Sequence, residues 1–156
     1  MRVRDIMTRD PKTCGPEMTL QDAAFLMHGA GCGILPVLAQ GRTIGVVTDR
    51  DICFGLAERD RPASEIPVSD AMSWRVYFCN QNDRISDALE TMTVKQVRRL
   101  PVDDDDGRLC GILSIDDVIL HSGATDMALV SAAETLQALQ GICQSTEASA
   151  YQGTWG

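Results

Sequence analysis

The strongest constraint on the fold of this chain is an internal duplication that covers most of its 156 residues. The pattern Val-x-Asp-x-Met occurs at residues 3–7 and again at 68–72, and Leu-Pro-Val occurs at 35–37 and again at 100–102. A Gly-x-x-[Ser/Thr]-x-x-Asp pattern then closes each copy. Because the three patterns recur in one order, we predict two similar halves with pseudo-twofold symmetry, an arrangement that creates a cleft for a ligand.

The two copies are almost free of gaps. The offset is 65 residues from Asp5 to Asp70, and it is 66 residues from Gly45 to Gly111. The one added residue lies in the run of four aspartates at 103–106. An element predicted in one copy is therefore supported by its counterpart in the other.

Each copy is predicted to contain two helices and a β-hairpin. The first helix of each copy has an apolar face at helical spacing. These faces are Leu20, Ala23, Ala24 and Met27 in the first copy, and Ile85, Ala88, Leu89 and Met92 in the second. Strands are expected at 34–38, 43–47, 100–102 and 109–113, and the second helices at 49–57 and 115–121. The fold class is thus α/β (α+β), with tandem repeats that each pack a small two- to three-stranded sheet against two helices.

The expected domain order follows the copies. We expect a first repeat at 1–57, a polar linker at 58–67, a second repeat at 68–123, and a C-terminal helix with a frayed tail at 124–156. The extra helix is predicted from one apolar stripe, namely Leu129, Ala132, Ala133, Leu136 and Leu139 or Gln140. This helix has no counterpart in the first copy.

Composition excludes several classes of protein. The formal net charge of −8 argues against a nucleic-acid surface, which needs a basic stripe. No apolar run approaches the roughly 20 residues of a transmembrane helix, and the first residues lack the apolar core of a signal peptide. We therefore expect a cytoplasmic protein. The six cysteines contain no Cys-x-x-Cys pair, so they are expected to be small apolar side chains, mostly in the core, rather than metal ligands.

The ordered recurrence of these motifs resembles the CBS domain pair, a module named after cystathionine β-synthase, over roughly residues 3–122. The chain is similar to the stand-alone bacterial type, in which no enzyme, channel or transporter is fused to the pair. The resemblance implies a regulatory module that binds AMP, ADP or ATP, with S-adenosylmethionine or NADH as further adenosine-containing ligands. It also implies a homodimer.

The resemblance places the ligand contacts where a strand turns into a helix. In the family the hydroxyl, here that of Thr48 or Ser114, contacts phosphate or sugar, and the aspartate, here Asp51 or Asp117, accepts hydrogen bonds from both ribose hydroxyls. A carboxylate suits a vicinal diol because it offers two acceptor oxygens. The same pattern is also a helix capping box that needs no ligand, so both interpretations stay open.

The copies differ in the cations that would hold a phosphate. The second copy has Arg98 and Arg99 where the first has Gly33 and Ile34. By resemblance, each cleft takes its aspartate from one repeat and part of its base-facing wall from the other. The Asp117 cleft would then join Arg99, which can bind phosphate in bidentate geometry, to the small Gly33 and Ile34. A solvated strand edge, or an ion pair with the aspartate run, is the alternative for both arginines.

The other cleft would contain Thr48, Arg50 and Asp51. Arg98 stands there in place of a glycine, where it would either clamp a phosphate or obstruct the base, so this cleft is ranked second. Tyr77 is a further candidate, for stacking on an adenine, with core packing as the alternative.

Three functions follow from these observations. The first is a sensor of an adenosine-containing ligand in the cleft between the repeats, which signals through dimer or inter-repeat geometry to an unknown protein target. The second is a ligand-free scaffold that binds a partner protein through the repeats and the helix at 127–139. An enzyme is disfavoured, because the two histidines are far apart in sequence and no nucleophile–base motif occurs. We predict the sensor, with no catalytic residue and no metal site.

Overall fold

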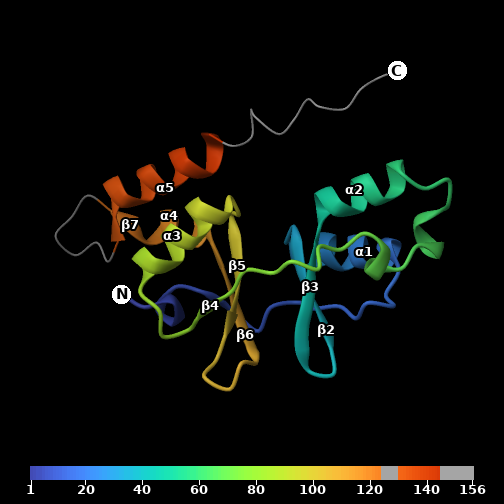
Figure 1. Cartoon of the computed structure of the whole chain (residues 1–156), viewed down its shortest axis with the longest axis horizontal. Coiled ribbons are helices and arrows are strands. Elements are labelled where there is room, and N and C mark those ends of the chain that lie inside the picture. Colours follow the sequence, from blue (N-terminus) through green and yellow to red (C-terminus); the bar gives the residue numbers. More distant parts are fainter. Residues whose placement is uncertain (124–129, 145–156) are drawn as a thin grey trace. The chain divides into compact units, whose positions relative to one another are not determined.

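The computed structural model describes residues 1–123 and 130–144, which form two compact units (Figure 1). The α1/α2 unit contains residues 10–76 together with 106–109. The α3/α5 unit contains residues 1–9 and 77–105, and the described chain from 110 onward. The units therefore cut across the sequence copies, because the opening segment of each copy belongs to the unit built mainly from the other copy.

The α1/α2 unit is a β-hairpin with two helices. Its elements are α1 (Leu20–Ala30), β2 (Ile34–Ala39), β3 (Arg42–Thr48), α2 (Asp49–Ala57) and two 3-10 helices (Ala63–Glu65 and Val68–Asp70). Thr19 is the N-cap of α1, since its Oγ1 accepts a hydrogen bond from the Asp22 backbone N–H at 3.1 Å. Ser73 bridges Val46 on β3 in antiparallel fashion, so the opening segment of the second copy extends this hairpin.

The α3/α5 unit contains a four-stranded sheet in the order β1-β6-β5-β4. The elements are a 3-10 helix (Val3–Asp5), β1 (Thr8–Arg9), β4 (Cys79–Asn80), α3 (Ile85–Lys95), β5 (Arg99–Asp103), β6 (Leu109–Ser114), α4 (Ile115–His121), β7 (Ser122–Gly123), β8 (Val130–Ser131) and α5 (Ala132–Gln144). The α/β class is confirmed. This sheet exceeds the expected two or three strands because β1, from the opening segment of the first copy, pairs antiparallel with β6.

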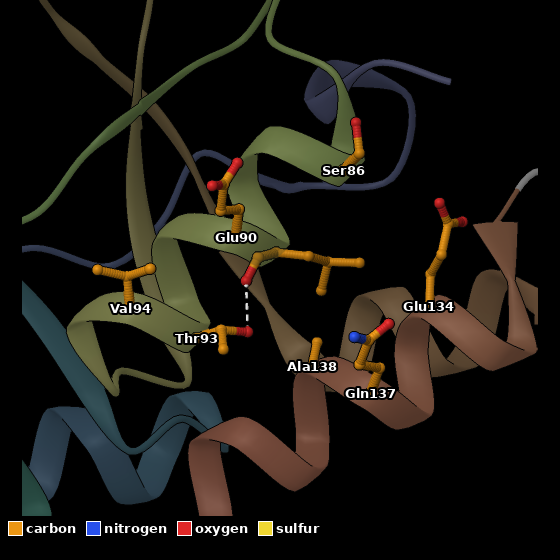
Figure 2. Close-up of a pocket in the computed structure, with 8 residues that line it drawn as sticks. Ser86, Glu90, Thr93, Val94, Glu134, Gln137 and Ala138 are labelled. Carbon is orange, nitrogen blue, oxygen red and sulfur yellow. Dashed lines mark hydrogen bonds between the residues drawn. The ribbon is translucent and has the colours of Figure 1, made fainter.

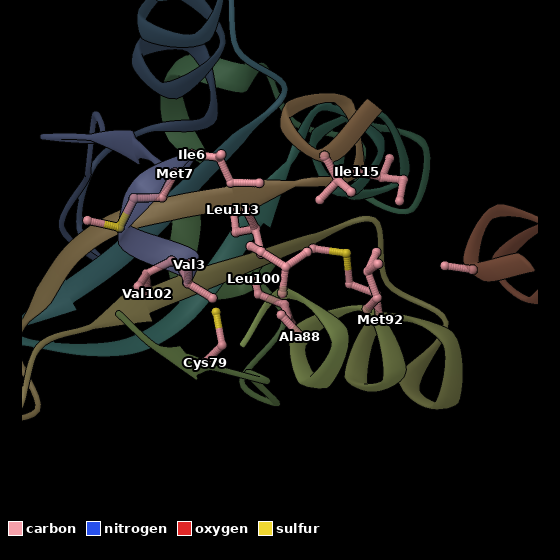
Figure 3. Close-up of a cluster of buried hydrophobic side chains, with 14 of the residues drawn as sticks. Val3, Ile6, Met7, Cys79, Ala88, Met92, Leu100, Val102, Leu113 and Ile115 are labelled. Atoms are coloured by element: carbon pink, nitrogen blue, oxygen red, sulfur yellow. The ribbon is translucent and has the colours of Figure 1, made fainter. Parts of the chain in front are cut away.

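Each unit has its own hydrophobic core. In the α3/α5 unit, Val3, Ile6 and Met7 of the opening segment pack with buried side chains of the sheet and α3, among them Leu100 and Leu113 (Figure 3). The core of the α1/α2 unit contains the corresponding segment of the second copy and also Ile66, which is fully buried within the expected linker. Burial of both opening segments explains why each copy begins with the same apolar spacing.

The glycines that begin the closing motifs make room for these opening segments. A Cβ on Gly111 would lie 2.7 Å from Met7 Sδ and 2.9 Å from the Thr8 carbonyl oxygen. A Cβ on Gly45 would lie 2.8 Å from the Ser73 carbonyl oxygen. Such distances are shorter than van der Waals contact, so only glycine lets the segment lie directly on the strand.

The C-terminal helix α5 buries a face different from the predicted one. Its buried side chains are Thr135, Ala138 and Ile142, whereas Leu136, on the predicted stripe, is 57% exposed. Leu129, also on that stripe, lies outside the described residues. The polar Thr135 can be buried because its hydroxyl donates a hydrogen bond to the Ser131 backbone carbonyl at 3.1 Å. Within the described chain, no helix is both long and apolar enough to cross a lipid bilayer.

Candidate ligand-binding site

The two closing motifs form the same capping box in the two units. Ser114 is the N-cap of α4: its backbone N–H and its hydroxyl donate to Asp117 Oδ2 at 2.8 and 2.6 Å, and its Oγ accepts from the Asp117 N–H at 3.1 Å. At the start of α2, Thr48 and Asp51 repeat these three hydrogen bonds at 2.8, 2.7 and 3.2 Å. Each aspartate is thus held in place at a strand-to-helix turn.

The cap leaves one oxygen of each carboxylate turned away from the helix start. Asp117 Oδ1 lies 3.5 Å from the hydroxyl oxygen of Thr8, on β1. Asp51 Oδ1 receives no hydrogen bond from any residue that the structure describes. Both side chains are half-buried, so an oriented acceptor is available to a ligand hydroxyl in each unit.

Cations lie beside the Asp117 motif. The Arg98 carbonyl accepts a hydrogen bond from the Ile115 N–H at 2.9 Å, which fixes residue 98 next to the start of α4. The Arg98 side chain is exposed, and no ion pair joins it to a described residue. Arg99 Nη2 lies 3.9 Å from Asp116 Oδ2, so its partner is this aspartate rather than the acidic run at 103–106. An exposed pair of this kind is weak and can be replaced by a ligand anion.

Gly33 and Ile34, which were expected to form part of the Asp117 cleft, belong to the same unit as the Asp51 motif and lie beside it. Their part in the Asp117 cleft stays a prediction. Ile34 is the cross-strand partner of Thr48 and is buried, and the Gly33 carbonyl accepts from the Asp49 N–H at 3.3 Å. A Cβ on Gly33 would lie 3.0 Å from Asp49 Oδ2. The absence of a side chain at residue 33 therefore leaves space for the Asp49 carboxylate.

Two of the predicted site residues, Arg50 and Tyr77, each form a cation–π contact within their own unit. The Arg50 guanidinium lies over the Phe54 ring, 5.4 Å from its centroid. Lys95 Nζ lies 5.2 Å from the centroid of the half-buried Tyr77 ring, which also packs against the core. These contacts favour core packing for Tyr77, the alternative kept open from the sequence.

The geometry adds residues that the sequence did not single out. Thr8 contacts Asp117, and Asp49 lies against Gly33. A signal for the first was present, since a hydroxyl residue follows the methionine of the opening motif in both copies, as Thr8 and Ser73. We refer below to the Asp117 site and the Asp51 site. The Asp117 site is Thr8, Arg98, Arg99, Ser114 and Asp117; the Asp51 site is Gly33, Ile34, Thr48, Asp49 and Asp51.

Two hollows lie within single units, and the lining of neither includes Asp51 or Asp117. One is a groove of about 250 Å³ between α3 and α5, and its lining includes Glu90 from α3 and Glu134 from α5 (Figure 2). A second hollow, of about 300 Å³, is lined by Met27, Ile52 and the Asp49 side chain, among others. Across residues 1–123 and 130–144, no group of three or more His, Cys, Asp or Glu side chains is placed to hold a metal ion.

The cysteines divide by burial. Cys14 and Cys79 are core residues, and desolvation raises their thiol pKa to about 11 and about 12. Burial also raises the pKa of Cys110, whereas Cys53 and Cys143 are exposed. The expectation of core cysteines is thus confirmed for two of the six.

Comparison with known proteins agrees with the duplicated architecture. The CBS domain matches residues 3–58 and again residues 68–123. The chain belongs to the CBS domain family. The CBS domain-containing protein YhcV of Bacillus subtilis (strain 168) is 36% identical over 126 residues, which cover 81% of this chain and 89% of that protein.

Solved CBS structures share the fold. The CBS-domain containing protein ATU1752 from Agrobacterium tumefaciens is 32% identical, with a TM-score of 0.69 and coverage of 77% of this chain and 98% of that chain. CBSX2, solved in complex with AMP, is 28% identical, with a TM-score of 0.67 and coverage of 76% and 93%. The architecture is thus that of a CBS pair, and one of its structural neighbours binds AMP.

Proposed function

We propose that this CBS pair is a cytoplasmic regulatory sensor that binds an adenosine-containing ligand of the AMP, ADP or ATP class, with the Asp117 site as the principal site. The observation that carries the proposal is the oriented Asp117 carboxylate, with one oxygen held by the cap and the other directed to the Thr8 hydroxyl. A ribose diol can bond to this carboxylate, and Arg98 and Arg99 supply guanidinium donors for a phosphate. The AMP complex of CBSX2 supports the ligand class.

A ligand-free scaffold is the second candidate, and two observations favour it. The capping boxes are complete without a ligand. In addition, Phe25 on α1 and Phe54 on α2 are 65% and 54% exposed, so apolar surface is available to a protein partner. The same surface supports the proposal of a homodimer, which sedimentation equilibrium would test directly.

A thermal-shift experiment separates the two candidates. At 100 times its Kd, a ligand stabilises the folded state by about 2.7 kcal/mol, which for a chain of this length raises Tm by roughly 5–10 °C. We expect AMP, ADP or ATP to produce such a shift in the wild-type protein, and Asp117→Asn to remove most of it.

Asp22→Asn is the matched control for this experiment. Asp22 forms two of the same three cap hydrogen bonds with Thr19 at the start of α1, those that involve the threonine hydroxyl, and it is not part of either site. Both variants should lose about 1 kcal/mol or less of stability through the cap, but only Asp117→Asn should lose the ligand shift. If no nucleotide shifts the wild-type transition, or if both variants respond to ligand alike, the scaffold interpretation replaces the sensor.

A further inference from the structure

We infer that the groove between α3 and α5 binds a partner protein, through an amphipathic helix that carries lysine or arginine beside its apolar face. The groove is independent of the proposed ligand site, because its lining includes neither Asp51 nor Asp117. A protein can therefore dock there whether the CBS pair acts as a sensor or as a scaffold.

The groove lies beside a close contact between the two helices. A Cβ built on Gly141 of α5 would lie 2.5 Å from Thr93 Cγ2 of α3, so the helices approach closely there. The α5 residues that line the groove are Glu134, Gln137 and Ala138, all earlier in the helix than Gly141. The volume of about 250 Å³ is several times the share of one water molecule, about 30 Å³, so the groove can accept an aliphatic side chain.

The floor of the groove is apolar. Leu89 of α3 and Ala138 of α5 both line it, and both are buried in the core of the unit. The Thr93 hydroxyl donates to the Leu89 backbone carbonyl at 2.9 Å, so this hydroxyl is satisfied within α3. Val94, which is also on the lining, is 65% exposed. An apolar side chain from a partner would therefore cover Val94 and remove further apolar surface from water.

Two carboxylates belong to the same lining. Glu90 comes from α3 and Glu134 from α5, and none of the eight described residues that line the groove is basic (Figure 2). Neither glutamate forms an ion pair with a residue that the structure describes. Lysine or arginine beside the apolar face of a partner helix would supply the opposite charge. A second copy of this chain would bring the same carboxylates and a net charge of −8, so charge repulsion disfavours it as the occupant.

The acidic groove is not repeated in the first copy. Glu90 corresponds there to Phe25, and Thr93 corresponds to His28. The helix α5, which forms one wall of the groove, has no counterpart in the first copy either. The duplication therefore does not account for the groove, which arises where α5 is added to the second copy.

Fluorescence anisotropy with two labelled peptides tests the inference on the full chain. One peptide has leucines at the spacing of an apolar helix face and lysines elsewhere, and the other has the same leucines with glutamates in place of the lysines. We expect the lysine peptide to bind the wild-type protein and the glutamate peptide not to bind. The double variant Glu90→Gln with Glu134→Gln should weaken binding of the lysine peptide about fivefold or more.

Glu17→Gln with Glu58→Gln is the matched control, because it removes the same charge from exposed positions of the α1/α2 unit. This control should leave the affinity within about twofold, since salt screens distant surface charges. Val94→Ser should weaken binding of the lysine peptide several-fold by removing apolar contact.

Three results would overturn the inference. The first is that the lysine peptide does not bind the wild-type protein, and the second is that the two double variants weaken it equally. The third is that Val94→Ser dissociates a dimer in sedimentation equilibrium, which would assign the groove to a second copy of the chain. None of these measurements uses a nucleotide, so their failure is distinct from failure of the proposed function.

Discussion

Alanine at Gly111 tests the most specific packing contact in the fold. A methyl group there would lie 2.9 Å from the Thr8 carbonyl oxygen and 2.7 Å from Met7 Sδ. The methionine can turn away because it is a flexible side chain, but the carbonyl belongs to strand β1. Relief therefore requires β1 to move from β6 by about half an ångström, given normal contact distances of about 3.5 Å.

The expected cost is that of an overpacked core. Small-to-large changes in well-packed sites destabilise by about 1–3 kcal/mol, and here Met7 is also displaced from a core in which it is 7% exposed. For a chain of this length the Tm should fall by roughly 2–10 °C. Urea unfolding followed by circular dichroism measures the free energy, and hydrogen exchange of residues 3–9 reports whether the opening segment loosens.

Gly29→Ala is the matched control. Gly29 lies in α1, and a Cβ built on it has no neighbour within 4 Å. The same substitution should therefore stabilise the protein, by about 0.5–1 kcal/mol, through helix propensity. An unchanged or increased stability of Gly111→Ala would refute the close packing of the opening segment on β6.

Three further predictions concern the buried thiols and α5. At pH 8 a thiol reagent should label the exposed Cys53 in the native protein but reach Cys14 and Cys79 only after unfolding, because burial raises their pKa to about 11 and about 12. Between about pH 9 and 12 the unfolded chain releases these protons before the folded chain does, so stability should fall as the pH rises through that window, and Cys79→Ala should flatten the fall. In the α3/α5 unit, Gly141→Ala should speed proteolysis of α5, since its Cβ would lie 2.5 Å from Thr93 Cγ2. The double variant with Thr93→Ser, which removes that methyl, should restore resistance.

Much of the local structure follows from the sequence alone. The helices predicted at 49–57 and 115–121 are α2 and α4 to the residue, and the hairpin strands agree within one or two residues. Each of these helices begins at a capping box, which defines its first turn, and the buried faces of α1 and α3 repeat at matching positions. Agreement between two copies makes each assignment firmer than either copy alone.

The face of α5 could not be predicted in the same way. The helix has no counterpart in the first copy, and apolar residues lie on more than one of its sides. The structure buries the side that includes Ala138 and Ile142, next to the glycine that lets α5 approach Thr93. The determining contact is thus between residues 93 and 141, which no periodicity within the helix reveals.

The duplication also could not indicate which copy each opening segment packs against. Residues 3–7 and 68–72 carry the same apolar spacing, so either segment is chemically suited to either core. The structure assigns each to the unit built mainly by the other copy: Met7 lies on Gly111, and Met72 lies beside Gly45. Sequence similarity therefore identifies the two copies, but the boundaries of these copies are not the boundaries of the two compact units.

This exchange connects folding with the candidate site. Val3, Ile6 and Met7 complete the core of the α3/α5 unit, and the next residue, Thr8, contacts Asp117. A fragment limited to the second copy would lack one strand of the sheet, would leave Gly111 uncovered and would remove the hydroxyl beside the carboxylate. Any ligand that bridges Asp117 and Thr8 would in turn stabilise the docking of that segment, because binding to the folded arrangement alone shifts the equilibrium towards it. Ligand binding and attachment of the N-terminal segment are therefore expected to be coupled in this protein.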